Sequence, residues 1–215
     1  MHQNPASPLK NKSSATTGKG LERTQAILHA ARAIFASEGY AGLSMRRVAA
    51  EVGISLSNVQ HYYPSKDLLI EAVLLMTMNR FQEKIDSISR DMGATSRAAQ
   101  LLSTIDMFLE ELGDPVTYGL FFEIWALAAR NEFASKLMDT MIARERKAIY
   151  KLIAGLNPDI SDDDYKLRAV LIVAQIEGLM LFRYHRPHKH SEMRAVHATL
   201  KTSVLTLAGI HQQPS

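Results

Sequence analysis

From Leu21 onward, apolar residues recur at the three- and four-residue spacing of helices, and no stretch alternates as a half-buried strand does. The pattern predicts an all-α fold, in which an N-terminal three-helix helix-turn-helix domain is joined to a six-helix domain. Three short helices are expected first, over about 22–38, 45–51 and 56–62. The longer helices are expected over about 65–89, 95–111, 115–130, 133–155, 162–184 and 190–208.

Helix ends are marked by small and capping residues. Gly39 ends the first predicted helix, and Gly53 ends the second, because glycine tolerates the left-handed conformation that closes many helices. Ser44 and Ser55 precede the second and third, where a hydroxyl can accept from the free N–H groups of the first turn. The run at 161–164, Ser-Asp-Asp-Asp, suggests a metal site, but a capped helix start explains it fully.

Charge and composition divide the chain into three parts. Residues 1–20 are rich in Lys, Ser, Thr, Pro and Gly, which predicts a disordered tail. This tail either adds contacts to a polyanion or has no role. Residues 1–66 carry a net charge of +5 and the remainder carries −2, out of +3 overall. We therefore expect a basic binding domain over 21–66 and a helical domain of different function over 67–210.

Residues 45–63 carry the strongest local pattern, that of a helix-turn-helix. Ala49, Gly53 and Val59 have the small, turn and apolar spacing required by two short helices that cross at a steep angle. The residues that remain outward on the second of these helices are short or hydrogen-bonding rather than densely charged: Leu56, Ser57, Asn58, Gln60 and His61.

Residues 21–75 resemble the N-terminal domain of the TetR family of bacterial transcription regulators. The matching positions are Ile27-Leu28, Ala30-Ala31, Phe35, Gly39, Ser44, Val48-Ala49, Gly53-Ile54-Ser55, Tyr63, Ser65-Lys66 and Leu68-Leu69. The string QHYYPSK at 60–66 is similar to that of the BetI-like branch of the family. Residues 121–131 and 176–179 also look like the family's C-terminal pattern.

The resemblance implies a regulator that binds an inverted-repeat operator in double-stranded DNA. Residues 56–62 would be the recognition helix in the major groove, with Leu56, Ser57 and Asn58 facing base edges. Arg46 would pair with a guanine, because a guanidinium matches guanine O6 and N7. Ser44, Tyr62 and Lys66 would contact phosphates. The full predicted set is Ser44, Arg46, Arg47, Ser55, Leu56, Ser57, Asn58, Gln60, His61, Tyr62 and Lys66.

Three of these positions keep two interpretations each. Arg47 is either a phosphate contact or an ordinary surface charge. Gln60, where the family commonly has Tyr, either reads an adenine or binds a phosphate. His61 either points into the groove or packs against the first helix.

The last two predicted helices carry wide apolar faces. Leu167, Leu171, Gly178 and Leu179 lie on the first of them, and Leu200 on the second. Family precedent pairs these helices with their counterparts in a homodimer, as a four-helix bundle, and half-sites in DNA need such a two-fold partner. The alternative is a core face within one chain.

An effector pocket is expected among the middle helices. Aromatic and Met residues recur there, although most such residues belong to cores. Gln175 and Glu177 interrupt an apolar run, where a buried polar group needs a partner. Trp125 with Glu123 would suit a cation. The predicted ligand-binding set is Phe108, Phe121, Phe122, Trp125, Met138, Met141, Gln175 and Glu177. In the family, the helix that begins at Ser65 would transmit ligand binding to the DNA-binding domain, and repression is the usual outcome. Activation, or co-repression by the ligand, is the alternative.

The remaining patterns favour no catalytic function. The chain has no Cys and no phosphate-binding loop, nucleophile elbow or zinc-protease motif, so we expect no enzyme, no cofactor and no metal. The basic run at 183–190 is interpreted as a loop rather than a zinc or nickel site. No apolar run is long enough to span a membrane, and the first twenty residues contain none that could form the core of a signal peptide. The protein is therefore expected in the cytoplasm. The competing hypothesis is a helical adaptor that binds only proteins.

Overall fold

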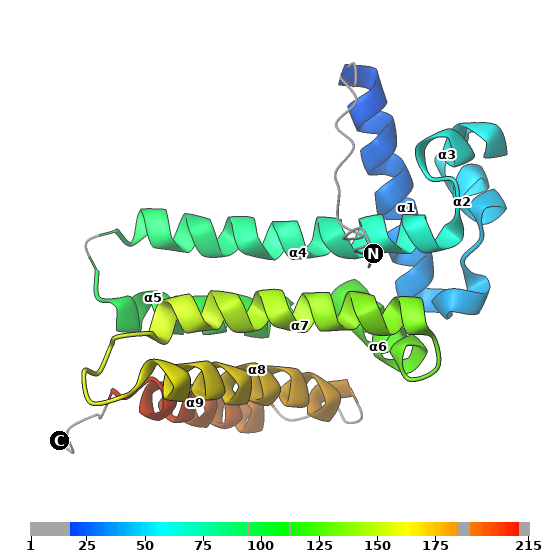
Figure 1. Cartoon of the computed structure of the whole chain (residues 1–215). Helices are drawn as coiled ribbons and strands as arrows, with labels where there is room; N and C mark the ends of the chain where they lie inside the picture. Colours follow the sequence, from blue (N-terminus) through cyan, green and yellow to red (C-terminus); the bar gives the residue numbers. More distant parts are fainter. Residues whose placement is uncertain (1–17, 94, 112, 185–189, 211–215) are drawn as a thin grey trace, which may run out of the picture.

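The computed structural model describes residues 18–93, 95–111, 113–184 and 190–210 (Figure 1). Within these ranges the chain is helical, without strands, and the predicted all-α class is confirmed. The helices are α1 Gly18–Gly42, α2 Met45–Val52, α3 Leu56–Tyr62, α4 Lys66–Asp91, α5 Arg97–Glu111, α6 Pro115–Ala128, α7 Glu132–Ile153, α8 Asp162–Tyr184 and α9 His190–Leu207.

The first helix is longer than predicted. α1 begins at Gly18, so residues 18–20 are helical and do not belong to a disordered tail; residues 1–17 lie outside the described ranges. The break predicted at Gly39 is present, since its φ of 71° and ψ of −173° interrupt the helix. The helix resumes after this break and ends at Gly42, so the predicted end at Gly39 came one turn too early.

Serine caps begin the helices of the N-terminal domain where the sequence predicts them. The side chains of Ser44, Ser55 and Ser65 accept from the amides of Arg47, Asn58 and Leu68, at 3.2 Å each. Each cap satisfies an N–H group that has no partner within its helix. The start of α8 behaves in the same way, because Ser161 Oγ accepts from the Asp164 amide at 3.1 Å.

The larger domain is a stack of helices with α7 at its centre. α7 packs against α4, α5, α6 and α8, and α9 lies beside α8 at the side of the stack away from α4 (Figure 1). α1, α2 and α3 sit at one end of α4, so that α4 spans the small domain and the large one (Figure 1). No helix in the described part of the chain has the length and hydropathy needed to cross a membrane.

A second connection between the domains is made by α1 and α6. A Cβ at Gly119 of α6 would lie 2.5 Å from the carbonyl oxygen of Ala36, so only glycine permits this approach of the two helices. Arg32 of α1 donates to Thr117 Oγ1 at 2.7 Å and to Asp114 Oδ2 at 3.3 Å. We call this contact between α1 and α6 the junction; it was not predicted from the sequence.

Candidate nucleic-acid interface and effector cavity

The two short helices α2 and α3 form a helix-turn-helix. Gly53 closes α2 with a φ of 70°, and the Ile54 amide returns to the Ala49 carbonyl at 3.0 Å. Val48, Ala49 and Val59 are buried between the helices and α1. This small core fixes the orientation of α3, and it leaves the opposite face of α3 directed to solvent.

The outward face of α3 carries the side chains that the sequence predicts to read DNA. Ser57, Asn58, Gln60 and His61 are exposed, and Leu56 is half-buried. Ser55 and Ser57 share a hydrogen bond of 2.9 Å between their hydroxyls. The His61 ring lies edge-on to Tyr62 at 5.3 Å and points outward, so its alternative place against α1 is wrong.

The two arginines at the start of α2 differ in their surroundings. Arg46 is exposed and has no partner among the described residues. Arg47 forms a salt bridge of 2.5 Å with Glu38 of α1, and its side chain remains 51% exposed. A guanidinium that is already paired must exchange one partner for another when it binds a phosphate. Arg46 is therefore the freer of the two cations for a contact with DNA.

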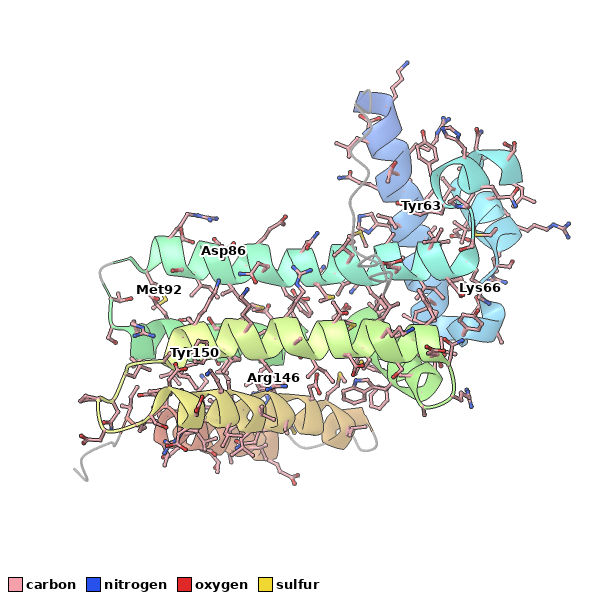
Figure 2. All side chains as sticks on the ribbon, in the orientation of Figure 1. Tyr63, Lys66, Asp86, Met92, Arg146 and Tyr150 are labelled. Atoms are coloured by element: carbon pink, nitrogen blue, oxygen red, sulfur yellow. The ribbon has the colours of Figure 1, made fainter. Side chains whose placement is uncertain are left out.

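Lys66 lies at the start of α4, beside the last turns of α1 (Figure 2). Its ammonium donates to the Tyr40 carbonyl and lies 3.6 Å from the centre of the Tyr40 ring. Desolvation by these neighbours lowers the pKa of Lys66. The side chain thus holds α1 against α4, and its predicted phosphate contact stays a prediction. The neighbouring Tyr63 is buried enough that its pKa is raised to about 12.

The turn at Gly39 and Tyr40 ties the small domain to α6. Glu123 Oε2 accepts from the Tyr40 amide at 3.2 Å, and a Cβ at Gly39 would lie 2.6 Å from the same oxygen. The Tyr40 hydroxyl donates to Asp67 Oδ1 at 2.9 Å. Burial raises the pKa of the phenol, and this hydrogen bond raises it further. Glu123 is consequently a structural group of the junction, and it does not accompany Trp125 in a ligand site.

A small cavity lies between α4, α5, α6, α7 and α8 and has about 20 Å³ of free volume. Three phenylalanine rings form one side of it. The ring of Phe81 is stacked with that of Phe121 at 6.1 Å and lies edge-on to that of Phe108 at 5.8 Å. The whole lining is Phe81, Phe108, Phe121, Glu145, Ile149, Val173, Ile176, Glu177 and Met180.

Two carboxyl groups face each other in this apolar cavity. Glu145 of α7 is hydrogen-bonded to Glu177 of α8. Desolvation raises the pKa of Glu145 well above its ordinary value, and the charge of Glu177 and the hydrogen bond between the two groups raise it further. Desolvation also raises the pKa of Glu177. Each carboxyl group therefore makes the ionisation of the other less favourable.

The structure brings only part of the predicted ligand set to this cavity. Phe108, Phe121 and Glu177 line it. Phe122 lies edge-on to Trp125 at 5.9 Å, and neither ring reaches the lining. The reason is that neighbouring residues on a helix face different directions, so Phe121 lines the cavity and Phe122 does not.

The other three predicted ligand residues also lie elsewhere. Met138 is buried in the core outside the cavity. Met141 lines a second, smaller cavity between α4 and α7. Gln175 faces α9, where its side-chain oxygen accepts from Ser203 Oγ at 3.0 Å. The sequence suggested that Gln175 would find its hydrogen-bond partner in a ligand, but Ser203 of α9 is that partner.

The second cavity contains a buried carboxyl group. Glu71 of α4 is 8% exposed, its Oε1 has no hydrogen-bond partner in the described residues, and burial raises its pKa. Arg144 of α7 lies at the same cavity and donates to Asn79 Oδ1 at 3.0 Å. Neither Glu71 nor Glu145 was predicted. Glu145 stands in a charged run that is typical of a solvated helix face, whereas Glu71 interrupts the apolar run 68–76, a signal that could have found it.

One face of α8 exposes a stripe of apolar residues. Leu167, Leu171 and Leu181 are 64%, 52% and 44% exposed, and Ala174 and Gly178 between them are exposed as well. These five residues recur at intervals of three and four, so they share one side of the helix. We call them the α8 stripe.

The comparisons with known proteins agree with this arrangement. A family model described as bacterial regulatory proteins of the tetR family matches residues 27–73. A second, described as the C-terminal region of BetI-type transcriptional repressors, matches residues 97–208, which is more than half of the chain. The chain belongs to the TetR family. Its C-terminal region is of the BetI type.

Individual TetR-family proteins are similar over most of their length. A protein of Xanthobacter autotrophicus, described as an uncharacterized HTH-type transcriptional regulator in the dhlA 5′ region, is 34% identical over 160 residues, 73% of this chain and 77% of that protein. The repressor KstR of Mycolicibacterium smegmatis is 24% identical over 90% of each chain. The solved structure of Salmonella enterica GusR covers 93% of this chain and 100% of its own, with a TM-score of 0.71 and 22% identity.

The TetR-family assignment decides the general function. The protein is a DNA-binding transcription regulator, and the hypothesis of a helical adaptor without DNA binding is not favoured. TetR-family regulators bind operator DNA and small-molecule effectors and act as dimers. The basic run at 183–190, which was interpreted as a loop, lies mostly outside the described residues.

Proposed function

We propose that this TetR-family protein is a repressor whose homodimer binds an inverted repeat and leaves it when an effector occupies the cavity between α4 and α8. The observation that supports the proposal most directly is the outward face of α3, which is polar, exposed and held in place by a buried core. Such a helix fits the major groove of DNA. Because its target is chromosomal DNA, we place the protein in the cytoplasm.

The dimer is proposed to form through α8 and α9. The α8 stripe leaves three leucine side chains in water, which is costly unless a second surface covers them. The exposed face of α9 beside it carries small residues that permit close packing: Ala195, Ala198, Thr199, Thr202 and Thr206. Paired across a two-fold axis, these helices would form a four-helix bundle and would set the two α3 helices about one DNA turn apart.

Two helices are placed to carry an effector signal to the DNA. α4 has Phe81 in the cavity and Lys66 against α1. α6 has Phe121 in the cavity and Glu123 against the turn at Tyr40. A ligand that requires a wider cavity would displace both helices, and the DNA-binding helices α1, α2 and α3 would tilt with them. The loss of DNA affinity is then set by how much more tightly the ligand binds the displaced arrangement than the original one.

The proposal is tested by selecting genomic DNA fragments with the purified full-length protein across a series of salt concentrations. We expect recovery of a short inverted repeat whose binding weakens steadily as salt is raised, because phosphate contacts release counterions. Fragments that share no motif at any salt concentration would contradict sequence-specific binding. A single half-site without its inverted copy would contradict the dimer alone.

A further inference from the structure

We propose that Glu71 is a positioning residue that keeps the contact between α4 and α7 easy to open, so that α4 can part from α7 when the regulator leaves its operator. The inference rests on the proposed function, because it names a residue that regulates the same response. It follows from a buried carboxyl oxygen that has no hydrogen-bond partner among the described residues and lies at the contact that this response must open.

The surroundings of Glu71 are apolar. Glu71 lies within the run 68–76 of α4, whose other members are Leu, Ile, Ala, Val and Met. Its side chain is 8% exposed, and five of the seven other residues that line the α4–α7 cavity are leucine or methionine. A carboxyl group that leaves water without a compensating partner costs more free energy than an apolar side chain of similar size in the same place.

The polar neighbours of Glu71 do not compensate it. Arg144 is the one basic residue in the lining, but its guanidinium donates to Asn79 Oδ1 at 3.0 Å, and no ion pair joins it to Glu71 in the described part of the chain. The Thr140 hydroxyl donates to the carbonyl of Lys136 at 2.9 Å. Burial accordingly raises the pKa of Glu71. The cavity of about 10 Å³ has the space of one water molecule, which replaces only part of the hydration that the carboxyl group loses.

A second buried glutamate shows the opposite arrangement. Glu111 of α5 is also 8% exposed, but it accepts from both Arg80 and Lys84 of α4. At the other end of α4, Lys66 holds the helix to α1. α4 is thus fastened near Lys66 and near Glu111, and Glu71 weakens its contact with α7 between these two points.

The contact that Glu71 weakens is the one that the proposed response must open. α4 lies along α7 (Figure 1), and the cavity between α4 and α8 has only about 20 Å³ of free volume. The described arrangement is therefore the one without effector, which the proposed function assigns to DNA binding. An uncompensated carboxyl group raises the free energy of this arrangement and regains water when α4 parts from α7. It thus narrows the free-energy difference between the two arrangements, so that a ligand with a modest preference can shift the balance.

The first test is thermal unfolding of the full-length protein and of Glu71→Met, which replaces the carboxyl group with an apolar side chain of similar length. We expect the midpoint of unfolding to rise by at least about 3 °C, because the buried carboxyl group is removed. Glu111→Met is the matched control. Glu111 is equally buried, but its loss leaves Arg80 and Lys84 without their partner, so this midpoint should fall. An unchanged or lower midpoint for Glu71→Met would overturn the proposal.

The second test measures how often α4 parts from α7. The chain has no cysteine, so a cysteine in place of Met141 is its single thiol. Met141 is 2% exposed and lines the α4–α7 cavity, so a thiol reagent reaches this position only when the contact opens. Adding Glu71→Met should slow the labelling at least roughly tenfold.

Ala169→Cys is the control for this labelling. Ala169 is buried on α8, so its labelling reports opening elsewhere in the fold and should slow much less when Glu71→Met is added. Equal slowing at both positions would overturn the proposal, since Glu71 would then affect only the stability of the whole fold. Unchanged labelling of Met141→Cys would overturn it as well.

Failure of this inference can be distinguished from failure of the proposed function, because neither test uses DNA. Glu71→Met should then bind the selected inverted repeat at least as tightly as the wild type. Roughly tenfold weaker binding at unchanged dimer mass would overturn the proposal, because the closed contact would belong to the form that has left DNA. If the wild type selects no inverted repeat, the proposed function fails, whereas a more stable Glu71→Met protein with slower opening still shows that Glu71 weakens the α4–α7 contact.

Discussion

Arg46 is the arginine that we propose to contact a base, since it is exposed and Arg47 is already paired with Glu38. Replacing Arg46 with alanine should reduce operator affinity by about 1–3 kcal/mol and should relax the preference at one base position. The reason is that a guanidinium that pairs with guanine O6 and N7 contributes only where that guanine is present. Binding to a set of operators with single base changes measures both effects.

The matched control for this substitution is Arg130→Ala. Arg130 is exposed at the end of α6 in the larger domain, so its loss changes the net charge equally without touching the DNA-binding face. An equal loss of affinity of Arg46→Ala on every sequence would identify Arg46 as a phosphate contact instead.

The carboxyl pair should give stability a characteristic dependence on pH. The pKa of Glu145 is raised in the folded protein above the ordinary 4.5. Between the two values the folded state binds more protons than the unfolded state, so the free energy of unfolding falls as pH rises. The stabilisation is complete below about pH 4.5 and is lost as pH passes the folded pKa. Of the residues that line the cavity, Glu177 is the one charged neighbour of Glu145.

Urea unfolding of the wild type and of Glu145→Gln across about pH 5 to 8 measures this dependence. We expect the variant to gain stability relative to the wild type as pH rises, because glutamine does not ionise. Contributions shared by both proteins, such as that of Glu71, cancel in the difference. A difference in unfolding free energy that does not change with pH would show that Glu145 is solvated rather than buried.

At the scale of elements, the junction is the contact most sensitive to a single methyl group. A Cβ at Gly119 would lie 2.5 Å from a backbone oxygen of α1, which cannot move without the helix. Gly119→Ala should destabilise the protein by about 1–3 kcal/mol, as overpacking of a core does. Chemical denaturation at fixed pH measures the change.

Gly18→Ala serves as the control, because Gly18 is also helical and its Cβ would have open space around it. Alanine there should leave stability unchanged or raise it slightly, in line with its helix propensity. If Gly119→Ala were as stable as Gly18→Ala, the approach of α1 to α6 would be looser than the structure has it.

The helices of the DNA-binding domain could be predicted closely because their limits depend on local chemistry. Ser44, Ser55 and Gly53 act within one turn of their own positions, so their residue types alone indicate the helix ends. The range predicted for α3 coincides with the observed Leu56–Tyr62. Gly39 was likewise recognised as a break, but the extra turn to Gly42 depends on contacts with α6.

The cavity between α4 and α8 could be predicted only in part, because it depends on how distant helices face one another. Apolar residues lie on most sides of α6, so its sequence pattern did not distinguish Phe121, which lines the cavity, from Phe122, which does not. Glu145 stands in the charged run Arg-Glu-Arg-Lys, which is typical of a solvated face. Only the packing of α7 against α8 reveals that its carboxyl group faces Glu177 and is desolvated.

At the scale of the whole molecule, the α8 stripe predicts the oligomeric state. Replacing Leu171 with glutamate places a charge in the middle of the stripe, where the partner's α8 is proposed to pack. We expect the homodimer to dissociate into monomers, because a desolvated and unpaired carboxylate opposes association. Sedimentation analysis at several protein concentrations measures the mass, and affinity for the inverted repeat should fall with it.

Leu21→Glu is the control for the mass measurement. Leu21 is 55% exposed, much like Leu171, but it lies on α1 away from α8. This variant should retain the mass of the wild type. If the Leu171→Glu protein kept the dimeric mass while folded, the dimer would use a different surface, and the exposed leucines of α8 would need another explanation.

The junction has a consequence for anyone who wishes to recombine regulators. In sequence, the DNA-binding segment ends near α4, and an exchange of segments at that point looks straightforward. In space, α1 is held by Asp114, Thr117, Gly119 and Glu123, all of which lie on α6 or at its start. A hybrid that takes its DNA-binding helices from one regulator and its effector domain from another must therefore transplant these four positions as well. Without them, the hybrid would keep both functions as separate activities but would lose the contact through α6, one of the two by which we propose that the effector controls DNA binding.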